Sequence, residues 1–169
     1  RASIQASIAE LPMESQQLLA SYGFHVDGEV LSKASAEQQE AAVAELVDQM
    51  LPHGPEGFAQ ARARLEEIGE IDHDSPLWRA HARLRFEARD LEGAAEALNT
   101  GLGLASNAGN SSRVLELLSD QAWQQESGRD TTLLETLERL SDFATRNNDA
   151  AATLQHFLQR GRLNGKWFA

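Results

Sequence analysis

The chain has 169 residues, no cysteine and a net charge of −11. This length suits one compact domain with a sizeable core, and the lack of cysteine excludes disulfides, thiolate catalysis and cysteine-ligated zinc. An acidic surface repels phosphate backbones, so we expect no nucleic-acid binding, and no apolar run reaches membrane-spanning length. Abundant Ala, Leu, Glu, Gln and Arg, without any alternating Val/Ile/Thr run, predict an all-α fold.

The first residue and the composition lead to expectations about the source and location of the protein. The chain begins with Arg1 rather than methionine, which indicates a processed or trimmed piece. Two lysines against thirteen arginines, with abundant alanine, indicate a GC-rich bacterial source. We expect a cytoplasmic location, although the lack of cysteine is equally compatible with the periplasm. Residues 1–74 carry fourteen acidic side chains against four basic ones, so the acidity is concentrated there.

The N-terminal part, residues 1–34, is predicted to be a helical capping segment. Apolar spacing favours a helix over residues 2–10 and a second one over 12–22. Residues 24–28 are predicted to form a turn, and Val30 and Leu31 a single helical turn.

A first helical hairpin is predicted over residues 35–74. Ser35 and Gln38 have the spacing of a capping box, in which the serine side chain accepts a backbone N–H and the glutamine reaches back. The helix that follows is expected to end near Leu51, and the next helix to end at Gly69.

A second hairpin is predicted over residues 75–109. Ser75 is a candidate N-cap, with Pro76 at the first helical position, where a missing N–H has no cost. The second helix of this hairpin begins at Leu91. The glycine-containing segment 101–106 is interpreted as the frayed end of that helix, since a phosphate-binding loop would need a preceding strand.

This second hairpin resembles a tetratricopeptide repeat, a 34-residue helix–turn–helix unit. Its bulky and small residues fall at the family's positions four, eight, twenty, twenty-four and twenty-seven: Trp78, Ala82, Ala94, Leu98 and Gly101. The resemblance implies antiparallel hairpins stacked in a right-handed superhelix, an α-solenoid with a concave binding surface.

Three residues of this hairpin depart from the family pattern. His81 lies at position seven, Arg85 at position eleven, where an aromatic residue is usual, and Ser106 where proline is preferred. We expect His81 to pack beside Trp78.

The repeat-like domain is predicted to span residues 35–163. Its third hairpin covers 110–147, a final helix covers 149–162, and 164–169 form a C-terminal tail. Trp123 lies on the apolar stripe of the third hairpin and is predicted, like Trp78, to be part of the core.

No catalytic, metal or cofactor site is predicted. The tripeptide His73-Asp74-Ser75 combines residue types of a catalytic triad, but neighbouring residues cannot adopt triad geometry, so a solvated loop ending in an N-cap is the favoured interpretation. Asp72, His73 and Asp74 lack the spacing of a calcium loop, and the five histidines share no metal-ligand spacing.

The tetratricopeptide resemblance implies a partner-binding face that includes Arg79, Arg83 and Phe86. The two arginines resemble a carboxylate clamp, which grips an acidic peptide end. The alternative is a solvated face on which Arg83 pairs with Glu87.

Trp167 and Phe168 in the tail are a second candidate site for a partner. Either they fold back on the last helix, which is the favoured interpretation, or they form an exposed anchor.

The sequence thus predicts a non-catalytic scaffold or adaptor that binds a peptide or another protein. The alternative from a different class is a regulatory or sensory domain that takes a small ligand and controls a fused output domain.

Overall fold

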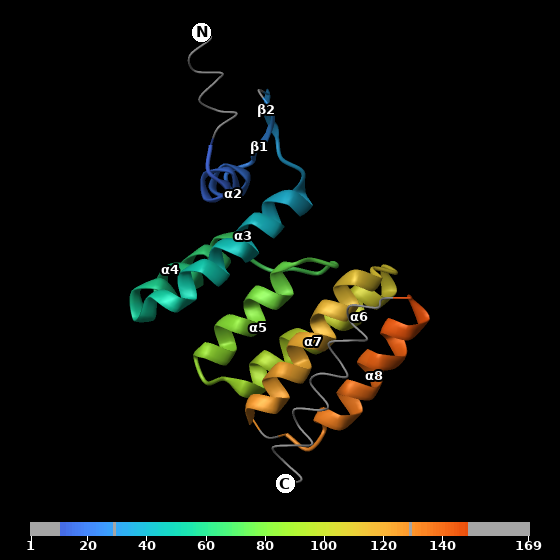
Figure 1. Ribbon diagram of the computed structural model, residues 1–169. Helices are drawn as coiled ribbons and strands as arrows, with labels where there is room; N and C mark the ends of the chain where they lie inside the picture. The colour runs from blue at the N-terminus through green and yellow to red at the C-terminus, as the bar shows by residue number, and fades with distance from the viewer. Residues whose placement is uncertain (1–10, 29, 129, 149–169) are drawn as a thin grey trace. The chain divides into compact units, whose positions relative to one another are not determined.

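The structure, a computed structural model, describes residues 11–28, 30–128 and 130–148 and is mostly helical (Figure 1). The chain forms two compact units, Arg1–Ala97 and Leu98–Ala169. The expected helices over 2–10 and 149–162 lie outside the described residues.

Apart from the N-terminal helix, the described helices lie within residues 35–74, 75–109 and 110–147. That these ranges are three hairpins stacked in a superhelix stays a prediction. Helix α6 (Leu91–Asn107) begins in the first unit and ends in the second. The elements in chain order are α2 (Met13–Ser21), β1 (Phe24–Asp27), β2 (Val30–Lys33), α3 (Ala36–Met50), the 3-10 turn η1 (Leu51–His53), α4 (Gly54–Ile68), α5 (Leu77–Glu87), α6 (Leu91–Asn107), α7 (Ser111–Gly128) and α8 (Leu133–Arg146).

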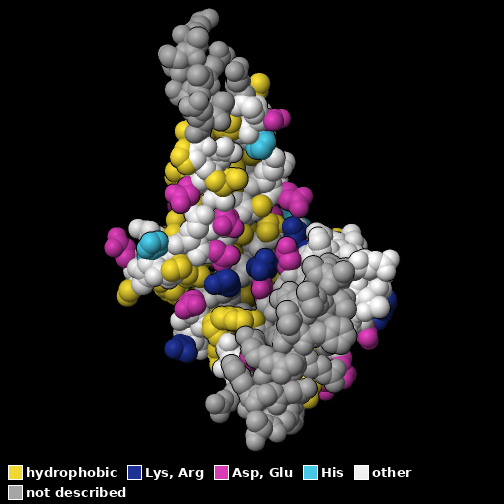
Figure 2. Space-filling view, viewed as in Figure 1, with side chains coloured by type: hydrophobic (Ala, Val, Ile, Leu, Met, Phe, Trp, Pro, Cys, Tyr) yellow, Lys and Arg dark blue, Asp and Glu magenta, His cyan; other side chains and the backbone are white. Residues whose placement is uncertain are grey.

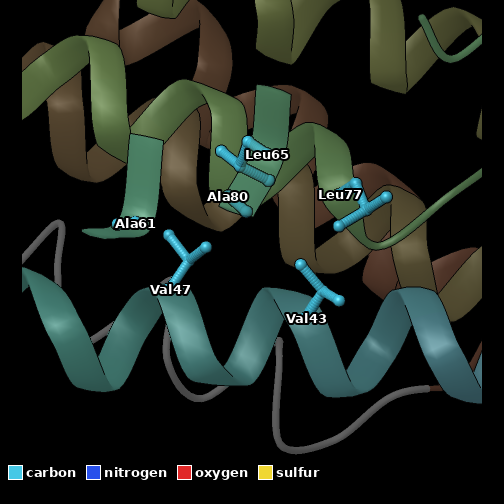
Figure 3. Close-up of a cluster of buried hydrophobic side chains, with 6 residues drawn as sticks. All are labelled: Val43, Val47, Ala61, Leu65, Leu77 and Ala80. Atoms are coloured by element: carbon cyan, nitrogen blue, oxygen red, sulfur yellow. The ribbon is translucent and has the colours of Figure 1, made fainter. Parts of the chain in front are cut away.

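Three helices build the main core of the first unit. Each of α3, α4 and α5 contributes two small or branched side chains that point toward one another (Figure 3). Their close approach is possible because alanine and valine, rather than long side chains, occupy most of the contact positions. The cluster consists of Val43, Val47, Ala61, Leu65, Leu77 and Ala80, all at most 3% exposed.

The caps of these helices follow the local sequence. The predicted capping box is confirmed, since Ser35 Oγ accepts the N–H of Gln38 at 3.2 Å and the Gln38 side chain accepts the N–H of Ser35 at 2.8 Å. Ser75 Oγ accepts the N–H of Leu77 at 3.1 Å, so its side chain caps the first turn as predicted, but α5 begins at Leu77, one residue later than expected, with Pro76 just before it. Gly69 ends α4 at φ +82°, a left-handed conformation that favours glycine.

A β-hairpin follows α2, and the prediction of a turn over 24–28 and a helical turn at Val30 and Leu31 is wrong. Strands β1 and β2 pair antiparallel, with Asp27 opposite Val30 at the closed end. Each strand has only four residues, too few to show alternation alone, and pairing between the two strands stabilises them. Gly28, at φ +59°, begins the connection of a two-residue hairpin loop.

The second unit contains the C-terminal part of α6 and helices α7 and α8. Asn110 Oδ1 accepts the N–H of Arg113 at 3.2 Å at the start of α7. Asp130 Oδ1 accepts the N–H of Thr132 at 2.9 Å just before α8, and this bond lowers the pKa of Asp130. Leu133, Leu137 and Ala122 form a buried cluster between α7 and α8.

Two expectations for the second unit are wrong. Residues 101–106 continue the helix α6 to Asn107 instead of fraying, because the buried face of the helix, including Leu102 and Ala105, extends through them. Trp123 is 45% exposed rather than part of the core. Apolar helical periodicity places Trp123 next to the buried Ala122, but adjacent residues point about 100° apart.

Candidate functional site

The first unit contains an open pocket of about 550 Å³ between the face of α4 and the C-terminal half of α5. Phe58 and Leu65 line it from α4, and Leu84 and Ala88 line it from α5 and the residue that follows. These four side chains give the pocket an apolar wall. We call it the α4/α5 pocket.

Charged side chains surround this apolar wall. Arg62 and Glu66 of α4 pair with each other, Nε to Oε1, at 2.8 Å, and both side chains are about two-thirds exposed. Arg85 donates from Nη1 to the carbonyl oxygen of Gly93 at 2.9 Å, so its guanidinium is held against the start of α6. Glu70 and Asp90 also line the pocket. The pocket therefore combines apolar contact area with both signs of charge.

His81 also lines the pocket, and its side chain is half-buried. Burial, and then the positive charge of Arg85, lower the pKa of His81 below its ordinary value of 6.5. The imidazole is therefore neutral at neutral pH, with one nitrogen able to donate a hydrogen bond and the other able to accept one. The ring also contacts Trp78, with centroids 6.3 Å apart and an interplanar angle of 47°, which confirms the expected packing of these two residues.

The residues that sequence reasoning chose for binding lie on another side of α5. Arg79 and Arg83 precede His81 and Arg85 by two residues each, which is about half a turn of an α-helix. Arg83 Nε lies 3.4 Å from Asp48 Oδ1 on α3, so its ion partner here is Asp48, whereas Glu87 was the expected one. Arg79 and Phe86 are half-buried. Trp167 and Phe168 lie outside the described residues.

The pocket residues of α5 did leave a signal in the sequence. His81 and Arg85 are two of the three departures from the tetratricopeptide pattern, and both line the α4/α5 pocket. The interpretation of the sequence gave these two irregularities no role in binding.

Glu40 connects the loop before α5 to α3. Its carboxylate accepts a hydrogen bond from Ser75 Oγ at 2.5 Å on one oxygen and lies 2.8 Å from His73 Nε2 on the other. The Ser75 hydroxyl donates to Glu40 and accepts from Leu77, so its proton is not directed at His73. The arrangement is that of a structural connection rather than a catalytic triad.

His73 should make stability depend on pH. Hydrogen bonds to Glu40 and Asp72 raise the pKa of His73 above 6.5. A raised folded-state pKa stabilises the fold fully below the unfolded pKa, and this contribution is lost as the pH rises through the folded pKa. We expect the parent to exceed a His73→Gln variant in Tm most clearly below about pH 6.5, with the difference shrinking at higher pH. A difference that is constant from pH 5 to 9 would contradict this assignment.

Within the part of the chain that the structure describes, no group of three or more His, Asp or Glu side chains has the geometry to hold a metal ion. None of the described helices is long and apolar enough to cross a membrane.

No family model, curated protein or solved structure matches this chain. The resemblance to tetratricopeptide repeats therefore rests on the residues of the second hairpin alone.

Proposed function

We propose that this chain is a protein-interaction module, a non-catalytic scaffold or adaptor, and that the α4/α5 pocket receives an apolar side chain of a partner peptide. The observation that carries the proposal is the pocket itself. Its apolar wall of Phe58, Leu65, Leu84 and Ala88 offers contact area, and the charged residues around it can pair with the polar backbone and neighbours of an inserted side chain. Buried apolar anchors of this kind supply most of the binding energy in peptide recognition.

The helical architecture supports this proposal over an enzyme. Helical hairpins present open surfaces between neighbouring helices, which suit partner recognition. In the cluster around Glu40, the polar groups of Ser75 are engaged in holding the backbone and α3 together. The imidazole of His81 adds a hydrogen-bonding group beside the apolar wall, a common composition for binding sites.

Arg79, Arg83 and Phe86 remain a predicted second contact region for an acidic partner segment. Such a segment would have to compete with Asp48 for Arg83. Because the α5 faces differ, the two regions can be tested separately: an Arg79→Ala, Arg83→Ala double variant addresses the arginines, and a filled pocket addresses the pocket.

Filling the pocket should weaken partner binding. Ala88 is exposed and lines the pocket at the end of α5, so Ala88→Trp places a large ring in the pocket without removing a core side chain. The matched control is Ala63→Trp, on an exposed part of α4 that does not line the pocket. We expect a partner captured by the parent from lysate to bind Ala63→Trp equally and Ala88→Trp at least about tenfold more weakly, measured by titration with the purified partner.

The outcomes distinguish the two binding regions. Equal binding of the partner by Ala88→Trp and Ala63→Trp would refute the α4/α5 pocket as the binding site. If the Arg79→Ala, Arg83→Ala variant alone loses the partner, the arginine face is the binding region. Both tryptophan variants should retain the helical circular dichroism spectrum of the parent, since both sites are exposed.

The size of the pocket favours one alternative, a regulatory or sensory domain that takes a small ligand. A volume of about 550 Å³ lies within the range of small-molecule sites, roughly 300–1,000 Å³. Native mass spectrometry of the purified chain decides between the two: a small molecule that co-purifies with the parent and with Ala63→Trp, but not with Ala88→Trp, would establish the sensory alternative.

A further inference from the structure

Strand β2 has an outer backbone edge, the side that faces away from β1. The N–H of Ala34 donates to the carbonyl oxygen of Gly23 at 3.0 Å, so these two residues are a hydrogen-bonded pair at the open end of the hairpin. Hydrogen-bonded and non-hydrogen-bonded pairs alternate along an antiparallel ladder. The pairs Phe24–Lys33 and Val26–Leu31 are therefore non-hydrogen-bonded. It follows that the N–H and C=O groups of Leu31 and Lys33 point away from β1.

Within the part of the chain that the structure describes, no backbone group pairs with this outer edge. Helix α2 packs along β1, whereas β2 has β1 as its only extensive neighbour among the described elements. All four residues of β2 are exposed. A two-stranded hairpin is only marginally stable in water, and an open edge is a template for a further strand.

The side chains beside this edge are unusually apolar for an exposed strand. Phe24 and Leu31 lie on the same face of the hairpin and are 46% and 44% exposed. Val30, at the closed end, is 62% exposed. Figure 2 shows hydrophobic side chains gathered over this N-terminal end of the first unit, with acidic side chains beside them. An added strand would therefore gain apolar contacts as well as backbone hydrogen bonds.

The charge around the hairpin indicates which kind of partner segment would bind. Residues 11–50 carry seven acidic side chains against one basic one, Lys33. Arg64 of α4 adds a second basic group beside Ser21 and Tyr22, so the region stays net negative. This field attracts a basic segment and repels acidic ones. A second copy of this chain brings the same acidic region, with the same sign, to any edge-to-edge contact, so self-association through β2 is disfavoured.

We propose that β2 is a docking strand: an extended, basic segment of a partner protein, with alternating apolar residues, adds to the free edge through Leu31 and Lys33. The added backbone extends the hairpin to three strands. Its apolar side chains lie over Phe24 and Leu31, and its basic side chains face the acidic surface of residues 11–50. This site is independent of the α4/α5 pocket and does not rest on the function proposed for that pocket.

The probe is a synthetic peptide of about nine residues that alternates lysine and valine, with blocked ends. A second peptide has the same composition with lysines and valines in separate blocks. We expect the full chain to bind the alternating peptide in about 0.1 M salt, measured by isothermal titration calorimetry, and to bind the block peptide at least about tenfold more weakly. The alternating peptide should also slow hydrogen exchange at the N–H groups of Leu31 and Lys33 by at least about tenfold.

Two variants at one position test the backbone contact. Lys33→Pro removes the outward N–H without touching a ladder bond to β1, and proline is accepted on edge strands. Lys33→Ala loses the same charge and keeps the N–H. We expect Lys33→Pro to bind the alternating peptide about tenfold more weakly than Lys33→Ala.

Several results would overturn the docking strand. Equal binding by Lys33→Pro and Lys33→Ala, with unchanged hydrogen exchange at Leu31 and Lys33, would refute it. So would equal affinity for the alternating and block peptides, since that indicates charge attraction alone. A dimer of the chain in sedimentation equilibrium that protects the same two N–H groups would make a second copy the occupant instead. Because an unfolded Lys33→Pro variant would also fail to bind, the exchange measurement on the parent provides the independent test.

Discussion

Replacing Gly57 by alanine should lower the free energy of unfolding of the first unit by about 3 kcal/mol. Gly57 is buried in the first turn of α4, where the chain has just left α3 through η1. A Cβ at this position would overlap the backbone carbonyl oxygen of Met50 and lie 2.9 Å from His53 Cβ. The obstacle is backbone at the end of α3, which cannot move aside as a flexible side chain does, so the corner between α3 and α4 would have to open.

The control for Gly57→Ala is the same substitution in a helix with space for it. Gly103 is an exposed residue of α6, and a Cβ there meets nothing within 4 Å. Since glycine disfavours helix interiors relative to alanine, Gly103→Ala should stabilise the chain by about 0.5–1 kcal/mol. Urea unfolding followed by circular dichroism measures both. If Gly57→Ala is as stable as the parent, the tight corner described here is wrong.

The features that could be predicted from the sequence are those fixed by a few neighbouring residues. The capping box at Ser35, the N-cap at Ser75 and the left-handed glycine at Gly69 each depend on atoms within a single turn, so residue types and spacing suffice to predict them. The mostly helical content could also be predicted, because helix propensity and apolar spacing are local properties of the sequence. In contrast, the exposure of Trp123 depends on which side of α7 other helices cover. Apolar periodicity locates the buried face of α7 but not where that face ends.

The β-hairpin and the pocket could not be predicted in this way because both depend on segments that meet only after folding. Val30 and Leu31 form a strand because β1 pairs with them, and neither strand has enough residues to show its period. The α4/α5 pocket brings Phe58 and His81 to one cavity from helices that are separated by a loop. The sequence shows His81 and Arg85 as irregularities of a repeat. That they line a pocket could not be predicted, because the opposite wall of the pocket comes from α4.

Ser75→Ala is expected to destabilise the first unit by about 2–3 kcal/mol. Ser75 is fully buried, and its hydroxyl makes two hydrogen bonds: it accepts the N–H of Leu77 and donates to Glu40 Oε2. Alanine would leave the first turn of α5 without its cap. It would also leave one oxygen of the Glu40 carboxylate, whose side chain is only 16% exposed, without its hydroxyl partner. Both losses disfavour the packing of α5 on α3.

A cap-matched comparison and a double-mutant cycle separate these two losses. Ser35 caps α3 in an exposed position, so Ser35→Ala should cost only about 1 kcal/mol, the usual value of an N-cap. The excess at Ser75 then belongs to the bond with Glu40. Combining Ser75→Ala with Glu40→Gln in urea unfolding should give a coupling energy of at least about 1 kcal/mol, because the two side chains act as one unit. Additive effects would instead mean that Ser75 stabilises α5 only as a cap, and that His73 alone joins the loop before α5 to Glu40 of α3.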